Sequence, residues 1–224
     1  MCNRYVSPGR ADIERIWGIG RRSPHPDKGR ELRPLGLGPF VRRGADRRRE
    51  VVVGQWGMIA PRSRTRELRT AEGRRLSTHH ARIEGIAAKW AFRNAWRRGQ
   101  RCLIPAESFD LPCWETGHEV WWTFRRADGQ PWALAGLWSE WKDPVSGEIV
   151  PSYTMVTENC DEHPLLGRMH KPDPRLPPER QDKRAAVPIE PEDWDRWLGG
   201  SIGDAYALID LPPPERILAV PSAR

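Results

Sequence analysis

The chain is poor in cysteine and lacks the spacings that make cysteine a metal ligand or a disulfide partner. Its 224 residues include four cysteines, which lie far apart at Cys2, Cys102, Cys113 and Cys160. No C-x-x-C pair is present, and no pair of histidines accompanies them at the spacing of a zinc site. The sequence therefore supports neither a zinc site nor a disulfide framework, and we expect no cofactor.

Long apolar runs are also missing. No segment approaches the roughly 18 consecutive apolar residues that a membrane-spanning helix requires. The N-terminal stretch MCNRYVSPGRADIERIW has no basic region followed by an apolar run, as a secretory signal would have. We expect a cytoplasmic protein without a membrane partner.

Acidic residues are outnumbered by basic ones, and phenylalanine and tyrosine are scarce beside tryptophan. The chain has 37 Lys and Arg against 30 Asp and Glu, a formal net charge of +7. This excess favours a polyanionic partner, because basic groups release counterions from a polyanion; an Arg-rich protein without such a partner has the same balance. Twelve tryptophans stand against four phenylalanines and three tyrosines, and tryptophan serves either in a core or as a surface on which bases stack.

The order of the periodic segments predicts a single α+β domain whose sheet is mostly antiparallel. Alternating and β-branched runs bounded by turn residues indicate strands, and apolar residues three and four apart indicate short helices. We assign the domain to residues 2–211 and a flexible, proline-rich tail to residues 212–224. The strands are predicted in 50–61, 101–109, 118–141 (a hairpin) and 151–160, the helices in 11–20, 82–98 and 188–200, and an exposed loop in 21–49.

Cys2 carries the most specific chemistry in the sequence. It is a small residue after Met1, so we expect removal of the methionine and a free α-amine beside the thiol. The reference pKa values are roughly 7.7–8.0 for the amine and roughly 8.5 for the thiol, so a useful fraction of each is nucleophilic near neutral pH. An aldehyde would form an imine with the amine, and the thiolate would close a thiazolidine ring. The same group can attack an amide with its own amine as base, and an incidental second-position cysteine is the third alternative.

Four segments together resemble one known family. MCNRY at the N-terminus, HHARIE at 79–84, RCLIPAESF at 101–109 and LLGRMHKPDP at 165–174 resemble the SOS-response-associated peptidases, the SRAP family. The resemblance implies a single domain with an antiparallel, barrel-like β core, short flanking helices and a basic DNA groove. It also implies a protein that shields abasic sites as DNA–protein crosslinks.

The resemblance assigns roles to particular residues. Cys2 corresponds to the family nucleophile, and Arg4 to a neighbouring residue that contacts DNA. His170 corresponds to a histidine that assists opening of the sugar ring and reversal of the crosslink, proton transfers that suit imidazole. Arg82 corresponds to a phosphate contact. Lys89 is a candidate for the same groove.

Two positions depart from the family pattern. His80 stands where asparagine is usual; it can still donate a hydrogen bond, so we retain it as a DNA contact. Leu111 stands where the family has a glutamate, and leucine cannot transfer a proton. Glu115 is the predicted substitute, with Asp110 and no substitute as the alternatives; Asp110 would need a bulge or a turn to point inward, because side chains alternate along a strand.

Trp56 follows the valine run and is either a core residue or a surface on which DNA bases stack. We include it among the predicted DNA contacts.

Three functions are compatible with these residues. The first is an abasic-site protein, a monomer, that binds single-stranded DNA and captures the ring-opened sugar aldehyde through Cys2. The second is a thiol autopeptidase or amidohydrolase that uses Cys2 and His170. The third is a DNA-binding homologue with a degenerate active site, for which His80 and Leu111 argue.

Overall fold

The computed structural model describes residues 3–19, 29–70 and 72–222. Five strands close into a barrel, in the order β10–β4–β3–β6–β9 and back to β10. All neighbours are antiparallel except β4 and β10, which run parallel. The predicted α+β domain with a barrel-like core is therefore confirmed. The barrel strands are β3 (Leu37–Arg43), β4 (Arg49–Trp56), β6 (Arg101–Ala106), β9 (Trp132–Lys142) and β10 (Ile149–Asn159).

One glycine explains how the barrel closes between β4 and β10. A Cβ atom on Gly54 would lie 2.8 Å from the carbonyl oxygen of Pro151 and 2.9 Å from the ring of Phe40. Glycine in a strand often marks such a close backbone approach. The valine run before Gly54 supplies the β-branched residues that favour the extended strand.

A second, antiparallel sheet packs beside the barrel, in the order β12–β8–β7–β1–β2. Short strands β5 and β11 pair with β10 on the barrel side. These strands are β1 (Tyr5–Ser7), β2 (Arg30–Leu32), β5 (His80–Arg82), β7 (Ser108–Cys113), β8 (Val120–Arg126), β11 (Arg184–Ala186) and β12 (Ile217–Pro221).

Two predictions for chain segments need correction. Residues 29–49, predicted as loop, contain β2, β3 and the start of β4, because long-range pairing overrides their Pro- and Gly-rich composition; residues 20–28 lie outside the described part. Residues 217–221, predicted as tail, pair with β8 as β12. The C-terminal stretch thus completes an edge of the second sheet.

The helices are short. The predicted helix over 82–98 is wrong for most of its length: pairing of β5 with β10 holds Arg82 extended, at φ −70° and ψ 127°, so no helix can include it. Only α2 follows, after a 3₁₀ turn. The helical segments are α1 (Arg10–Trp17), α2 (Arg93–Arg97), α3 (Trp194–Gly199), α4 (Ile202–Ala207), η1 (Ile83–Gly85), η2 (Leu166–Arg168), η3 (Pro191–Asp193) and η4 (Pro214–Arg216).

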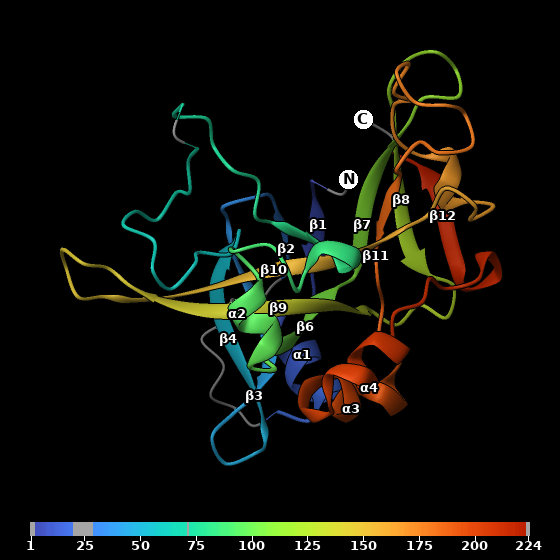
Figure 1. Cartoon of the computed structure of the whole chain (residues 1–224). Helices are drawn as coiled ribbons and strands as arrows, with labels where there is room; N and C mark the ends of the chain where they lie inside the picture. The colour runs from blue at the N-terminus through green and yellow to red at the C-terminus, as the bar shows by residue number, and fades with distance from the viewer. Residues whose placement is uncertain (1–2, 20–28, 71, 223–224) are drawn as a thin grey trace.

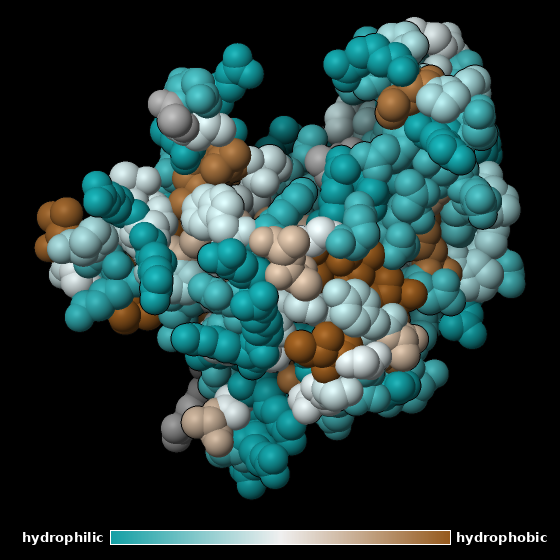
Figure 2. Space-filling model, in the orientation of Figure 1, coloured by the Kyte–Doolittle hydropathy of each residue, from teal (hydrophilic) through white to brown (hydrophobic). Residues whose placement is uncertain are grey.

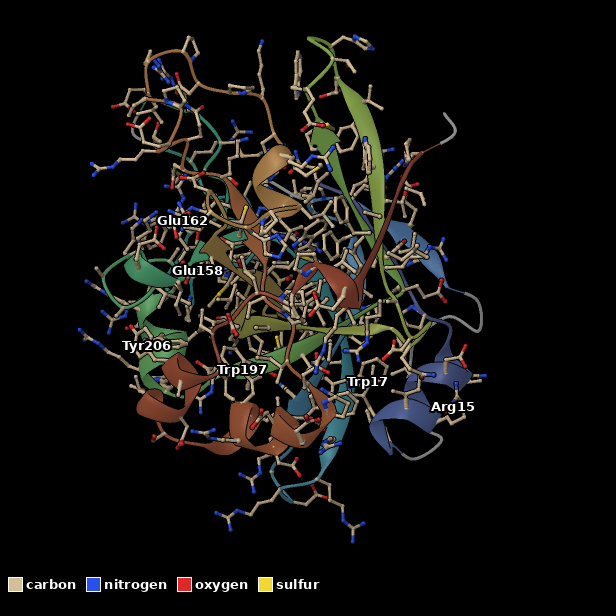
Figure 3. All side chains as sticks on the ribbon, turned by 90° about the vertical axis from the view of Figure 1, so that its right-hand side faces the viewer. Arg15, Trp17, Glu158, Glu162, Trp197 and Tyr206 are labelled. Carbon is tan, nitrogen blue, oxygen red and sulfur yellow. The ribbon has the colours of Figure 1, made fainter. Side chains whose placement is uncertain are left out.

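Tryptophan serves mainly in the core. Seven of the twelve are buried: Trp17, Trp56, Trp96, Trp132, Trp141, Trp194 and Trp197. Trp17 of α1 and Trp197 of α3 point inward between their helices and the barrel, whereas Arg15 lies at the surface (Figure 3). Within the described residues, no helix combines the length and the apolar character needed to cross a membrane.

Candidate active site

A buried ion pair fixes the start of β1. The Arg4 guanidinium donates to the carboxylate of Asp110 in β7, and both side chains are almost fully buried. Asp110 also accepts a hydrogen bond from the Thr123 hydroxyl at 2.8 Å, and its backbone N–H donates to the Arg4 carbonyl at 3.0 Å. Cys2 lies outside the described residues; the chain from Arg4 onward is held against β7 by both main-chain and side-chain contacts.

The register of β7 decides where its side chains point. Its pairing with β8 runs without interruption from Phe109 to Cys113, so side chains alternate between two faces. Phe109 and Leu111 lie in one apolar cluster, and Leu111 is 0% exposed. Asp110 faces the other way, toward Arg4, and needs no bulge to be buried there. Leu111 is therefore a core residue, and position 111 offers no carboxyl group.

His170 is held between β7 and β11. It has a left-handed backbone, φ 67°, and is buried. The backbone N–H of His170 donates to the Pro112 carbonyl, and its ring Nε2 lies 2.9 Å from the Arg184 carbonyl oxygen. Because a carbonyl can only accept, Nε2 carries the hydrogen and Nδ1 the lone pair. Burial is the main cause that lowers the pKa of His170 to about 4, so the ring is neutral at pH 7.

His79 is a site residue that the sequence alone did not reveal. Its Nε2 donates to the side-chain oxygen of Asn3 at 3.2 Å, and its Nδ1 accepts from the Ser77 hydroxyl at 3.1 Å. Burial lowers its pKa to about 4. His80, which we predicted as a DNA contact, is only 6% exposed, and the centroid of its ring lies 4.5 Å from that of His79. Nothing in the spacing of HHARIE signals the contact with Asn3.

Trp56 is part of the core, which corrects its prediction as a stacking surface. It is 0% exposed, its ring packs edge-on against Tyr5 at 5.0 Å, and its indole N–H donates to the His79 carbonyl at 3.0 Å. A base could stack on it only after the barrel opened. Through this hydrogen bond Trp56 supports the residue that precedes β5.

The predicted phosphate contacts lie beside these histidines. Arg82 is partly exposed and pairs with Asp182 at 2.6 Å; Lys89 is exposed. Strands β5 and β11 flank β10 at the same level, where Thr157 is opposite both Arg82 and Ala186. His80 and the Arg184 carbonyl that binds His170 are thus brought to the same end of the molecule.

A basic segment borders this end. Residues 62–75 contain six arginines and two glutamates, a net charge of +4 (6 − 2). Figure 2 shows a deep notch between this segment, teal in Figure 1, and the opposite wall built from the β7–β8 turn and the 171–182 loop. The segment's charge makes the notch suited to a polyanion. No group of three or more His, Cys, Asp or Glu in the described part of the chain is arranged to hold a metal ion.

Comparison with protein families gives one match of nearly full length. The model of the family described as SOS response associated peptidase (SRAP) matches residues 1–220. The chain belongs to the SRAP family. It is therefore a member of a peptidase-like family associated with the DNA damage response. A search of curated proteins found no match.

Solved structures of other proteins share this SRAP fold. A protein from Bordetella bronchiseptica is 31% identical over 100% of both chains, with a TM-score of 0.83. A protein from Bacteroides thetaiotaomicron is 17% identical, covering 98% of this chain and 91% of its own, with a TM-score of 0.73. A phage-related protein from B. bronchiseptica is 15% identical, covering 100% and 95%, with a TM-score of 0.66. The last two support the fold alone.

Glu115 does not replace the glutamate missing from this SRAP site. Its carboxylate oxygens each accept a hydrogen bond from Arg168 at 2.7 Å, and each of the two side chains is 44% exposed. The hydrogen bond from Arg168 is the main cause that lowers the Glu115 pKa. A carboxyl group that stays ionised and faces solvent is a poor proton donor at neutral pH. Our prediction for Glu115 is therefore corrected: it anchors Arg168, two residues before His170.

We expect His170 to make the stability of the fold depend on pH. An unfolded histidine titrates near 6.5 and the folded one near 4, so between these values only the unfolded chain binds the proton. The free energy of unfolding should fall as the pH drops from about 6.5 to about 4, by on the order of 2–3 kcal/mol from this residue. Urea unfolding at several pH values measures the slope.

The variant His170→Asn should reduce that slope and leave the part that His79 contributes, because asparagine tolerates the left-handed backbone and has no proton to gain. His118→Asn, at an exposed position in the β7–β8 turn, is the matched control and should keep the wild-type slope. Identical slopes for wild type and His170→Asn would contradict the assignment.

Proposed function

We propose that this SRAP protein binds single-stranded DNA and captures abasic sites as a covalent thiazolidine on Cys2. The observation that carries the proposal is the buried Arg4–Asp110 pair, two residues after Cys2. It holds the beginning of β1 beside His79, through the Asn3 contact, and at the notch bordered by the basic segment 62–75. This arrangement favours an N-terminal group that acts on a ligand bound in the notch.

The proposed reaction requires only the two nucleophiles of Cys2 and a route for protons. The α-amine adds to the aldehyde carbon of the ring-opened sugar, and the carbinolamine loses one water to give an imine. The thiolate then adds to the imine carbon and the nitrogen takes a proton, so the adduct weighs the sum of protein and DNA less one water. His170, neutral at pH 7, is the imidazole to which the family resemblance assigns these proton transfers.

The departure from the family pattern at position 111 bears on rate rather than on binding. Leu111 provides no carboxyl group for loss of water from the carbinolamine, and Asp110 is occupied by Arg4. We therefore expect slow crosslinking with DNA affinity retained. Single-stranded DNA is the proposed substrate, because its sugar is reached without unstacking a duplex.

The test is incubation of the methionine-free protein with a uracil-containing single strand that uracil glycosylase has treated. A heat-stable band on a denaturing gel, with the mass of protein plus DNA less one water, is the expected result. DNA binding without any adduct would favour the degenerate-site alternative, for which Leu111 and His80 argue. Release of a peptide fragment with no DNA adduct would favour the thiol peptidase.

A further inference from the structure

The exposed Trp90 borders a pocket that also contains the predicted DNA contacts His80, Arg82 and Lys89. The pocket has a volume of about 310 Å³ and lies between the end of the basic segment and the residues after η1. Trp90 is 49% exposed, although the helical pattern predicts it on the buried face of a helix. Because that helix is absent, the indole stands at the surface. The pocket is lined mainly by Leu76, Thr78, His80, Lys89, Trp90 and Phe92.

The pocket combines an apolar interior with a basic rim. Leu76, Trp90 and Phe92 supply apolar surface, while Lys89 is exposed at the edge and Arg82 contributes a partly exposed guanidinium. The six arginines of residues 62–75 precede it directly in the chain. A ligand with a flat apolar part and a negative part fits this combination. Exposed aromatic side chains beside positive charge are the usual platform for the bases of a single strand.

The pocket is continuous with the proposed site, because His80 belongs to both. His80 and Arg82 are two residues apart in β5 and so face the same side of the strand. A strand whose abasic sugar lies beside the N-terminal segment would pass its neighbouring nucleotide over this face.

We propose that Trp90 is the stacking platform for one unpaired nucleobase next to the abasic site, with Lys89 and Arg82 binding the adjoining phosphate. This deepens the proposed function and rests on it. The volume suits one base with its sugar, at the lower end of the range of small-molecule pockets, about 300–1,000 Å³. The contact requires a planar base and no particular hydrogen-bonding edge, so it should be tolerant of sequence.

Equilibrium binding to a single strand that contains one tetrahydrofuran site tests this assignment, since that analogue has no aldehyde and cannot crosslink. Trp90→Ala should weaken binding by roughly tenfold or more, the usual effect of losing one base stack, and Trp90→Phe should recover most of it. Tyr206→Ala is the matched control: Tyr206 is a 44% exposed aromatic residue on α4 (Figure 3) that does not line the pocket, and its loss should leave the affinity unchanged.

A second tetrahydrofuran, moved stepwise along the same strand, identifies the stacked base. When the second tetrahydrofuran replaces the stacked nucleotide, binding by wild type should weaken by the same factor as the Trp90→Ala substitution causes. Binding by Trp90→Ala should not weaken further at that position. Equal affinities of wild type and Trp90→Ala, with abasic-site crosslinking intact, would overturn this inference and leave the proposed function standing. Absence of any single-strand binding by wild type would overturn both.

Discussion

Replacement of Cys2 by alanine is expected to abolish the heat-stable thiazolidine adduct with abasic single-stranded DNA completely. The thiazolidine needs an amine and a thiol on adjacent carbons, and alanine keeps only the amine. The noncovalent affinity should stay within about twofold of wild type, since phosphate contacts supply most nonspecific affinity. A denaturing gel measures the adduct, and binding to the tetrahydrofuran strand measures the affinity.

Two further variants separate the roles of the amine and the thiol. Cys2→Ser keeps the amine and should form only an imine, which appears on the gel after reduction with borohydride and disappears without it. An extension before Cys2 keeps the thiol but removes the free α-amine, and should prevent the adduct. An undiminished heat-stable adduct with Cys2→Ala would exclude the proposed chemistry. The three buried cysteines, Cys102, Cys113 and Cys160, are unsuited to replace it; burial raises the pKa of Cys102 and that of Cys160.

Replacement of Asp110 by alanine is expected to be among the most destabilising single changes in the chain. It leaves the Arg4 guanidinium buried without its main partner, and breaking a buried pair in this way costs about 3–5 kcal/mol. Glu31, whose carboxylate lies 3.7 Å from Arg4, compensates in part and favours the lower end of that range. Urea unfolding at pH 7 measures the change in the free energy of unfolding.

A double variant distinguishes the buried charge from the packing around it. Arg4→Met with Asp110→Leu should regain most of the lost stability, because both charges are removed together; Thr123 keeps a partner, the Ser222 hydroxyl at 2.7 Å. Asp12→Ala is the control, since the Asp12–Arg15 pair is more than half exposed and should cost at most about 1 kcal/mol. A loss for Asp110→Ala as small as that of Asp12→Ala would show that the pair contributes little.

The same double variant tests the function of Arg4. If Arg4 contacts DNA, the restored fold should still bind the single strand more weakly than wild type. Recovery of both stability and affinity would limit Arg4 to the structural role that its burial already supports.

Local patterns in the sequence predicted several elements well. The strand around Val51–Val53, helix α1 and the segment that forms η3 and α3 follow from period-two and period-3.6 patterns, which depend on neighbours in sequence. The helix over 82–98 failed for the opposite reason. Pairing of β5 with β10, about 75 residues later in the chain, competes with the helical pattern and prevails.

The features of the site likewise fall into those that local sequence reveals and those that depend on distant contacts. Cys2 was identified from sequence because an N-terminal aminothiol is a covalent property, and Leu111 because a missing carboxyl group can be recognised from the motif alone. The partners of Asp110 and His79 are 106 and 76 residues away along the chain, and no periodicity encodes such distances.

The sequence by itself therefore determined the chemistry available at the N-terminus, the net positive charge of the chain and the position of barrel strand β4. Only the tertiary structure decided that Trp56 is core, that Glu115 faces solvent and that Trp90 stands at the surface. The physical reason is that exposure depends on which distant segments cover a side chain, and strand pairing across the barrel sets that cover.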